Sequence, residues 1–288
     1  MKEFLVKLGK IDRRVIYLLV ILAVVIPLIV KIRLPIFISR ETNGVYTIIE
    51  HCPEDKIVLL DCTWDAGNRG ENWPQTEAVM VHLMRKGIKF AIMSRIPQGT
   101  GFGREIAEKV AKKYGKKYGI DWCNLGYLPG EAAMIQALAK DIKGVVKKDI
   151  KGTPLDSIPM MQGIEDIHDI SLVCGIAYWP SEDWLRFVQG VYGTNVAFCS
   201  SAIVSSAMYP FLDSGQLCGL LVGVRGAAEY ERLLGTEELG TELIVPQSMV
   251  HLLIVVLIVL ANIGFWAERR EKKEERRGIR DEGGETGK

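Results

Sequence analysis

Two long apolar segments that contain no charged residue constrain this chain more than any other feature. They cover residues 15–30 and 250–267 of the 288 residues. About 20 apolar residues in a helix cross the hydrocarbon core of a bilayer, and flanking basic side chains can complete a slightly shorter stretch. The first segment is longer than the apolar core of a cleaved signal peptide, which is the alternative for a stretch near the N-terminus. We therefore expect transmembrane helices at residues 14–34 and 248–267, with the lipid bilayer as a partner.

Basic residues beside the two segments predict the orientation of the chain. Five Lys and Arg residues lie within residues 1–14, and eight lie within residues 268–288. Basic residues near the ends of a membrane span favour the cytoplasmic side. We expect a two-pass protein of the cell membrane, whose N-terminal segment (1–13) and charged tail (268–288) are cytoplasmic and whose central domain is extracytoplasmic.

The charge of the central part excludes one class of partner. Residues 15–267 contain 26 Asp and Glu against 23 Lys and Arg, and no basic stripe runs through them. A protein that binds nucleic acid needs a basic surface to neutralise phosphates. We therefore expect no nucleic-acid partner for the central domain.

Short apolar runs alternate with amphipathic runs along residues 36–246. The apolar runs predict buried strands at residues 57–62, 88–93, 122–127, 170–178, 195–199 and 217–222. The amphipathic runs predict helices at residues 76–85, 103–113, 131–142, 181–189, 202–212 and 227–234. Strands that are apolar on both faces and separated by helices form parallel sheets covered on each side. The sequence therefore predicts a Rossmann-like or flavodoxin-like α/β domain, with a mainly parallel sheet sandwiched by helices, between the two transmembrane helices.

Sheets of this kind bind ligands beyond the carboxyl ends of their strands. The segments expected there are rich in glycine, hydroxyl groups and aromatic rings, and they cover residues 61–72, 94–103, 178–181 and 200–206. The candidate ligand-binding residues in these segments are Asp61, Thr63, Asp65, Ser94, Gly99, Gly101, Gly103, Tyr178, Trp179 and Ser200.

Two groups among these candidates have a catalytic and a structural interpretation. The glycines of QGTGFG (98–103) precede a predicted helix whose N-terminus could hold an anion, but their spacing is not that of a dinucleotide-binding loop and better suits a flexible turn with a cap. Asp61 and Asp65 follow the first strand, where carboxylates bind Mg²⁺, act as nucleophiles or accept hydrogen bonds from local backbone. An enzyme is favoured if Asp61, Thr63, Ser94 and the amides of this glycine segment converge on one pocket.

Aromatic residues crowd the same predicted rim and form either a binding surface or a core beneath the loops: Trp64, Trp73, Tyr178, Trp179 and Trp184. The six cysteines lack zinc or redox spacing, so we expect free thiols buried as small apolar residues. The acidic cluster at residues 165–169 is expected to be a solvated loop, and no metal site is predicted. The sequence contains no nucleophile elbow and no metalloprotease motif, so it predicts no catalytic residue and leaves the cofactor unknown.

Five stretches of the central domain carry a family resemblance: RKGIKFAIMS (85–94), PQGTGFG (97–103), KYGIDWCNLGY (117–127), GTPLDSIPMMQGI (152–164) and YPFLDSGQLCGLLVGVRGAAEYE (209–231). They resemble a prokaryotic family of membrane-anchored α/β proteins that has no assigned activity. The resemblance implies one α/β domain held between two spans, and it implies no catalytic residue.

These observations favour a non-catalytic, membrane-anchored subunit whose α/β domain binds a ligand or a partner at the carboxyl ends of its strands. The expected partner is another subunit of a membrane complex or a second copy of the chain. Two alternatives remain open: an enzyme that acts on a phosphorylated or nucleotide-like substrate, and a sensor similar to periplasmic binding proteins that signals through the spans.

Overall fold

The computed structural model describes residues 12–30 and 35–285 and divides the chain into two units. One unit comprises residues 1–34 and 242–288, and the other comprises residues 35–241. Helices α2 (Arg13–Val30) and α11 (Leu239–Glu285) contain the two apolar segments, and both are long and apolar enough to cross a membrane. Most of the predicted N-terminal segment, and the end of the first predicted span at residues 31–34, lie outside the described residues.

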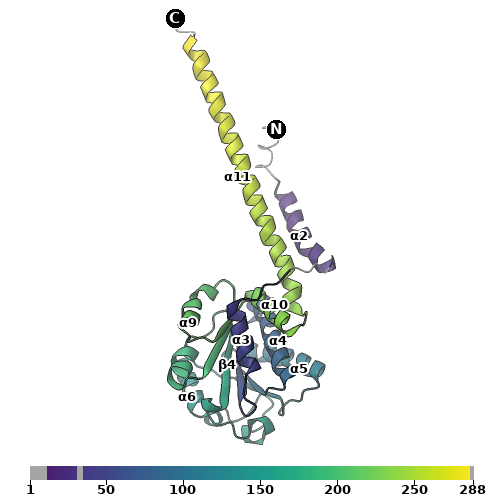
Figure 1. Ribbon diagram of the computed structural model, residues 1–288, viewed down its shortest axis with the longest axis vertical. Coiled ribbons are helices and arrows are strands. Elements are labelled where there is room, and N and C mark those ends of the chain that lie inside the picture. The colour runs from purple at the N-terminus through teal and green to yellow at the C-terminus, as the bar shows by residue number, and fades with distance from the viewer. Residues whose placement is uncertain (1–11, 31–34, 286–288) are drawn as a thin grey trace. The chain divides into compact units, whose positions relative to one another are not determined.

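Six parallel strands form one sheet in the second unit: β1 (Ile57–Thr63), β2 (Phe90–Ser94), β3 (Trp122–Tyr127), β4 (Ile170–Ala177), β5 (Asn195–Ser200) and β6 (Gly219–Val222). Their order is β3-β2-β1-β4-β5-β6. Figure 1 labels β4, which is one of the two central strands of this order. All six predicted strands and their parallel arrangement are confirmed. This order is the Rossmann order and differs from the flavodoxin order, so the direction of winding reverses between β1 and β4.

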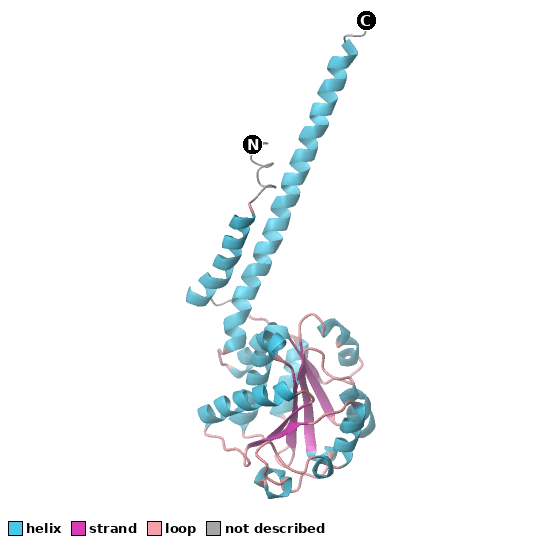
Figure 2. Cartoon of the chain, turned by 180° about the vertical axis from the view of Figure 1, so that it is seen from behind, coloured by secondary structure: helices cyan, strands magenta, loops and turns pink. Residues whose placement is uncertain are grey.

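Helices cover both faces of the sheet (Figure 2). The first face carries α3 (Arg40–Glu50), α4 (Arg69–Lys86), α5 (Pro97–Tyr114) and α10 (Gly223–Leu234). The second face carries α6 (Ala132–Lys140), α7 (Ile142–Val145), α8 (Gly190–Tyr192), α9 (Tyr209–Asp213) and the short turns η2 (Leu155–Ser157), η3 (Pro159–Met161), η4 (Ile167–Asp169) and η5 (Leu185–Gln189). Two further turns, η1 (Ala66–Asn68) and η6 (Ser205–Ala207), follow β1 and β5.

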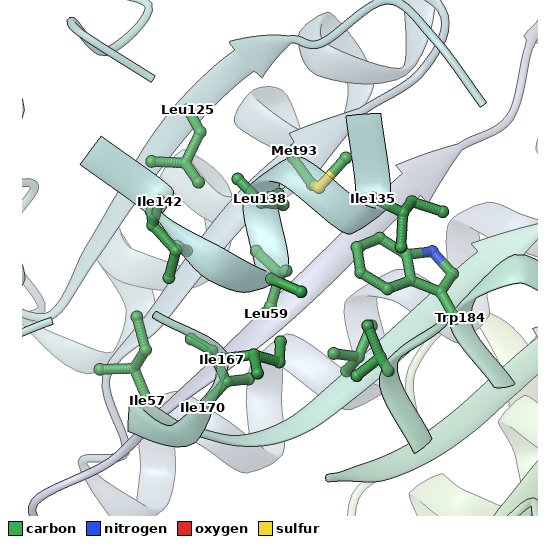
Figure 3. Packing of buried hydrophobic residues seen from close by; sticks show 14 of the residues in the cluster. Ile57, Leu59, Met93, Leu125, Ile135, Leu138, Ile142, Ile167, Ile170 and Trp184 are labelled. Carbon is green, nitrogen blue, oxygen red and sulfur yellow. The ribbon is translucent and has the colours of Figure 1, made fainter. Parts of the chain in front are cut away.

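Alternate residues of each strand point to opposite faces, which builds two apolar cores. On the second face, Leu59 of β1 packs in one cluster with Ile135 and Trp184 (Figure 3). On the first face, Leu60 of β1 packs in another cluster with Met80 of α4. The same alternation places the side chains of Asp61 and Thr63 on the second face.

Helix α3 was not predicted from the sequence, and its contact with β6 depends on two glycines. A Cβ atom on Gly44 would overlap the carbonyl oxygen of Cys218, and one on Gly219 would overlap the backbone of Val45. Only glycine lets the helix and the strand approach this closely.

A polar network joins α3 to α4 and α10. His82 Nδ1 lies 2.7 Å from the hydroxyl of Tyr230, and His82 Nε2 lies 2.9 Å from Glu50 Oε1. The ammonium of Lys86 lies 2.6 Å from Glu50 Oε2. The hydrogen bond from Lys86, followed by those from His82 and Tyr46, lowers the pKa of Glu50 to about 2, whereas burial lowers the pKa of His82. Glu50 is therefore ionised and His82 neutral at pH 7.

Several predicted element bounds are wrong. Helices α4 and α5 begin at Arg69 and Pro97, earlier than predicted, and Pro at the first helical position loses no hydrogen bond because its amide would have no partner there. The predicted helix at residues 202–212 is broken into η6 and α9. All six cysteines are free.

Candidate functional site at the carboxyl end of the sheet

Asp61 is the centre of a buried polar cluster at the end of β1, where it is 1% exposed. Thr63 Oγ1 donates a hydrogen bond to Asp61 Oδ1. Trp184 Nε1 donates to Oδ2 over 2.8 Å, and Arg95 Nε donates to Oδ2 over 3.1 Å. Both carboxylate oxygens therefore have donors from the protein itself.

Arg95 balances the charge of Asp61. It follows β2 directly, its backbone amide donates to Thr63 Oγ1 over 2.9 Å, and its side chain is 8% exposed. Its Nη1 atom also lies 3.2 Å from Oε2 of the exposed Glu131. A buried charge is tolerated when it is paired and its hydrogen bonds are made. The pair of Asp61 and Arg95 meets this condition through protein groups alone.

The ring of Trp184 lies at the point where the winding of the sheet reverses, between β1 and β4. It belongs to the segment after β4, whereas Asp61 belongs to β1, and these neighbouring strands mark the reversal. The indole is fully buried beside Ile135 (Figure 3). Doubly wound sheets usually bind ligands at this reversal. Here the indole lies beside the only carboxylate of β1.

The geometry gives Asp61 a structural role. A general base must come within hydrogen-bond reach of the proton that it removes. Asp61 is instead enclosed by Thr63, Arg95 and Trp184. This cluster fixes the ends of β1 and β2 against the segment that follows β4.

The glycines of the QGTGFG segment lie inside the first turns of α5, so they do not form the loop that we expected from the sequence. A Cβ atom on Gly99 would overlap the carbonyl oxygen of Cys62 and the side chain of Ser94. One on Gly103 would lie 2.9 Å from Ile92. These two glycines therefore allow the helix to pack closely on the sheet, whereas Gly101 faces open space.

Ser94 belongs to this packing contact as well. Its hydroxyl donates to the carbonyl of Ile96 over 2.8 Å and accepts from the Ile96 amide over 3.2 Å. Ser94 and the glycines lie on the first face of the sheet, and Asp61 and Thr63 lie on the second. The convergence expected for an enzyme is therefore not observed.

Asp65 has a local role at the start of η1. Its Oδ1 atom accepts hydrogen bonds of 2.9 Å from the Gly67 amide and from Asn68 Nδ2. This contact is the local backbone cap that the sequence left as the alternative to a metal ligand. Among the described residues, no group of three or more His, Cys, Asp or Glu side chains is arranged to hold a metal ion.

Tyr178, Trp179 and Ile203 are exposed on the two loops that follow β4 and β5, and we call these three residues the rim patch. Their exposed fractions are 41%, 50% and 79%. The Ser201 amide donates to the carbonyl of Tyr178 over 3.3 Å, which joins the loops that carry the patch. The rim patch therefore keeps three large apolar or aromatic side chains exposed at this end of the sheet.

The other rim aromatics belong to the core. Trp64, Trp73 and Trp184 are 1%, 7% and 0% exposed. The ring of Trp64 stacks on Phe102 at a centroid distance of 4.8 Å, and Arg69 lies over Trp73. The five aromatic residues predicted at the rim thus divide into an exposed pair, Tyr178 and Trp179, and three buried rings.

Ser200 lies beneath the rim patch with its backbone tied to α4. Gln75 Nε2 lies 3.0 Å from the Ser200 carbonyl, 3.2 Å from that of Leu221 and 3.1 Å from that of Gly223. The Ser200 hydroxyl is buried without a hydrogen-bond partner among the described residues. Gln75 therefore fixes the ends of β5 and β6, and Ser200 does not reach the surface.

Sequence reasoning missed three residues of this region, Arg95, Gln75 and Glu131, and it named Trp184 as a rim aromatic without its hydrogen bond to Asp61. Arg95 carries a usable signal, because a charged residue directly after a strand next to β1 can reach the carboxylate of Asp61. Gln75 and Glu131 have no comparable signal, since both belong to ordinary helical sequence. Ile203 was also missed, because one apolar residue in a polar loop does not mark a surface.

The strand order and the helices on both faces define a doubly wound α/β domain, joined in one chain to two helices that are long and apolar enough to cross a membrane. Comparison of the chain with models of protein families, with curated proteins and with solved structures found no match. The resemblance to a prokaryotic family of membrane-anchored proteins therefore stays a prediction.

Proposed function

We propose that the chain is a non-catalytic binding subunit of a membrane complex, and that a protein partner binds to the rim patch. The exposure of Tyr178, Trp179 and Ile203 on two adjoining loops carries this proposal. Apolar side chains that remain exposed side by side mark interaction surfaces. Large aromatic residues are also the side chains that contribute most to protein interfaces.

The loop beneath the patch is held by hydrogen bonds. The Ala202 amide donates to Glu71 Oε2 over 3.0 Å, and Ser205 Oγ donates to the Ala202 carbonyl over 2.8 Å. A preorganised loop loses little conformational entropy when a partner binds. The rim patch is therefore presented in a fixed arrangement.

The two apolar helices support a partner in the same bilayer. Two molecules confined to one membrane meet at a high effective concentration, so a small contact can hold them together. The partner in this proposal is another membrane subunit or a second copy of the chain. The basic residues at both ends of the chain support cytoplasmic termini and an extracytoplasmic domain.

The alternative functions have weaker support. An enzyme for phosphorylated or nucleotide-like substrates would use Asp61 and the glycines of α5, but Asp61 is enclosed and Gly99 and Gly103 pack against the sheet. A sensor needs a ligand site at the reversal point, where Trp184 lies beside Asp61.

Photo-crosslinking in cells tests the proposal. A photoreactive amino acid replaces Trp179 in the full-length chain, and a second variant carries it at Val191, which is 63% exposed and precedes β5 at the other end of the sheet. We expect a discrete adduct from position 179 and none from position 191. Mass spectrometry of the adduct then identifies a second copy or another membrane protein.

A charge in the patch provides the control. Ile203→Asp adds a carboxylate to the proposed interface without disturbing a buried contact, so it should abolish the adduct from position 179. The matched change Val191→Asp should leave the adduct unchanged. An adduct that survives Ile203→Asp, or the absence of any adduct at position 179, would overturn the proposal.

A further inference from the structure

A cavity of about 240 Å³ lies at the opposite, amino end of the sheet. Its walls come from three parts of the α/β domain: the end of α3 with the turn before β1 (48–56), the start of β4 (168–171) and the start of β5 (192–195). All three parts belong to the same unit of the structure. None of these residues was a candidate ligand-binding residue from the sequence, and His168 was expected to belong to a solvated loop.

The charged and ionisable groups of the wall favour an anion. Lys56, His51 and His168 line the cavity, and none of its lining residues is Asp or Glu. Glu54 and Asp55 belong to the turn before Lys56, yet neither lines the cavity. The described residues offer Lys56 no ion pair. Its ammonium is therefore free to pair with a ligand.

The two imidazoles leave the same nitrogen, Nε2, without a protein partner. His51 Nδ1 lies 2.8 Å from the carbonyl oxygen of Thr47, and His168 Nδ1 lies 2.9 Å from Oδ1 of Asp166. Both partners are acceptors, so each Nδ1 carries its proton. Each Nε2 then has no partner among the described residues, and on protonation it becomes a second donor.

The remaining wall combines hydroxyl groups with apolar surface. Tyr192 and Thr194 add hydroxyl groups, and Ile48, Pro53 and Ile170 add apolar atoms. Ligand sites commonly pair a few oriented polar groups with an apolar wall, and sites for drug-sized ligands occupy about 300–1,000 Å³. This cavity is smaller, so it suits a smaller molecule.

We propose that this cavity binds a small organic anion, in which one carboxylate or phosphate group is attached to a short apolar body. The anionic group pairs with Lys56 and the Nε2 atoms of His51 and His168, and the apolar body lies against Ile48 and Ile170. The cavity is separate from the rim patch, so this proposal does not depend on the proposed binding of a protein partner.

Nuclear magnetic resonance of the histidine rings tests this site in the full-length chain in detergent. The chain has four histidines, of which two line the cavity, while His82 is buried in the same domain and His251 lies in α11. Phenyl phosphate and benzoate are titrated separately at one fixed pH. We expect at least one of them to shift the signals of His51 and His168 saturably and to leave His82 unmoved.

The two titrations distinguish a phosphate ligand from a carboxylate ligand. Saturation by phenyl phosphate alone identifies a phosphate ligand, and saturation by benzoate alone identifies a carboxylate ligand. Benzyl alcohol, which has the same ring and no charge, should cause no saturable shift. Saturation by benzyl alcohol, or by neither anion, would overturn the proposal.

Lys56→Gln should weaken binding about threefold to fivefold, as expected for a partly exposed ion pair. The matched control is Lys89→Gln, because Lys89 precedes β2 as Lys56 precedes β1 but does not line the cavity. The unchanged signal of His82 verifies that each variant is folded. Equal affinities of the two variants would contradict the assigned role of Lys56.

Discussion

Glu229 and Glu231 lie two residues apart on α10 and bind the first turns of two different helices. Glu229 Oε2 accepts from the Ser39 amide, at the start of α3, over 2.9 Å. Glu231 accepts from the amides of Gly240 and Thr241, at the start of α11, over 2.7 and 2.8 Å. One short helix of the α/β unit therefore caps both α3 and the start of α11.

Removal of either carboxylate should loosen only its own helix start. We expect Glu231→Ala to speed amide hydrogen exchange at residues 238–241, because loss of a cap costs about 1 kcal/mol. Glu229→Ala should speed exchange at residues 39–43 instead. Hydrogen exchange measured by mass spectrometry on the full-length chain distinguishes the two. Equal acceleration at both helix starts in either variant would show that the two caps are not separate.

The hydrogen bond between Trp184 and Asp61 should contribute measurably to stability. Trp184→Phe keeps a buried ring but removes one of the two donors to Asp61 Oδ2, and a hydrogen bond to a charged group contributes about 1.5–3 kcal/mol. The matched control is Trp122→Phe, since Trp122 is equally buried but its Nε1 atom has no partner among the described residues. Denaturant unfolding of the full-length chain in detergent should show a larger loss for Trp184→Phe. Equal losses would mean that the hydrogen bond contributes nothing.

Two glycines of α5 should respond to alanine in opposite directions. Gly99→Ala forces a methyl group against the Cys62 carbonyl, and such overpacking costs about 1–3 kcal/mol or more. Gly101→Ala meets no neighbour within 4 Å and should stabilise the helix by about 0.5–1 kcal/mol. The midpoint of thermal unfolding measures both. A stabilising Gly99→Ala would show that α5 does not pack on the sheet as described.

Glu50 should make the domain sensitive to acid. Lys86 first, and then His82 and Tyr46, lower its pKa from 4.5 to about 2. Because the folded pKa lies below the unfolded value, the stabilisation is complete above about pH 4.5 and is lost as the pH falls towards 2. Glu50→Gln should therefore reduce stability at pH 7 and flatten the decline between pH 4.5 and 2. Glu105→Gln, at an exposed position of α5, serves as the control and should keep the decline of the unchanged chain.

The sheet was predictable because its strands are apolar on both faces, a pattern that few other elements share. Helix α3 was missed because its sequence, RETNGVYTIIE, is polar apart from one narrow face and contains Gly44. A glycine is required at position 44 because the helix packs closely against the carbonyl of Cys218, and the sequence does not show this contact. Helix starts were misplaced for a related reason, since Arg69 and Pro97 begin helices before the amphipathic pattern becomes visible.

The candidate site was predictable in position and only partly in content. Sequence reasoning placed Asp61 at the carboxyl end of the first strand, where the structure has it. Its partners come from distant parts of the chain, since Arg95 and Trp184 are 34 and 123 residues away. Local patterns cannot identify such partners. Whether a rim aromatic is exposed or buried likewise depends on tertiary contacts. Trp64 is buried because it stacks on Phe102, whereas Tyr178 remains exposed.

The indole of Trp184 fills the space beside the carboxylate of Asp61 at this end of the domain. With Trp184→Gly, the carboxylate of Asp61 would form the floor of a newly opened chamber, shaped like the indole that had filled it. Free indole supplied in solution has the matching outline and an N–H donor, so it should re-enter and restore the lost stability. The same chamber would be a starting point for designing a receptor for flat heteroaromatic molecules.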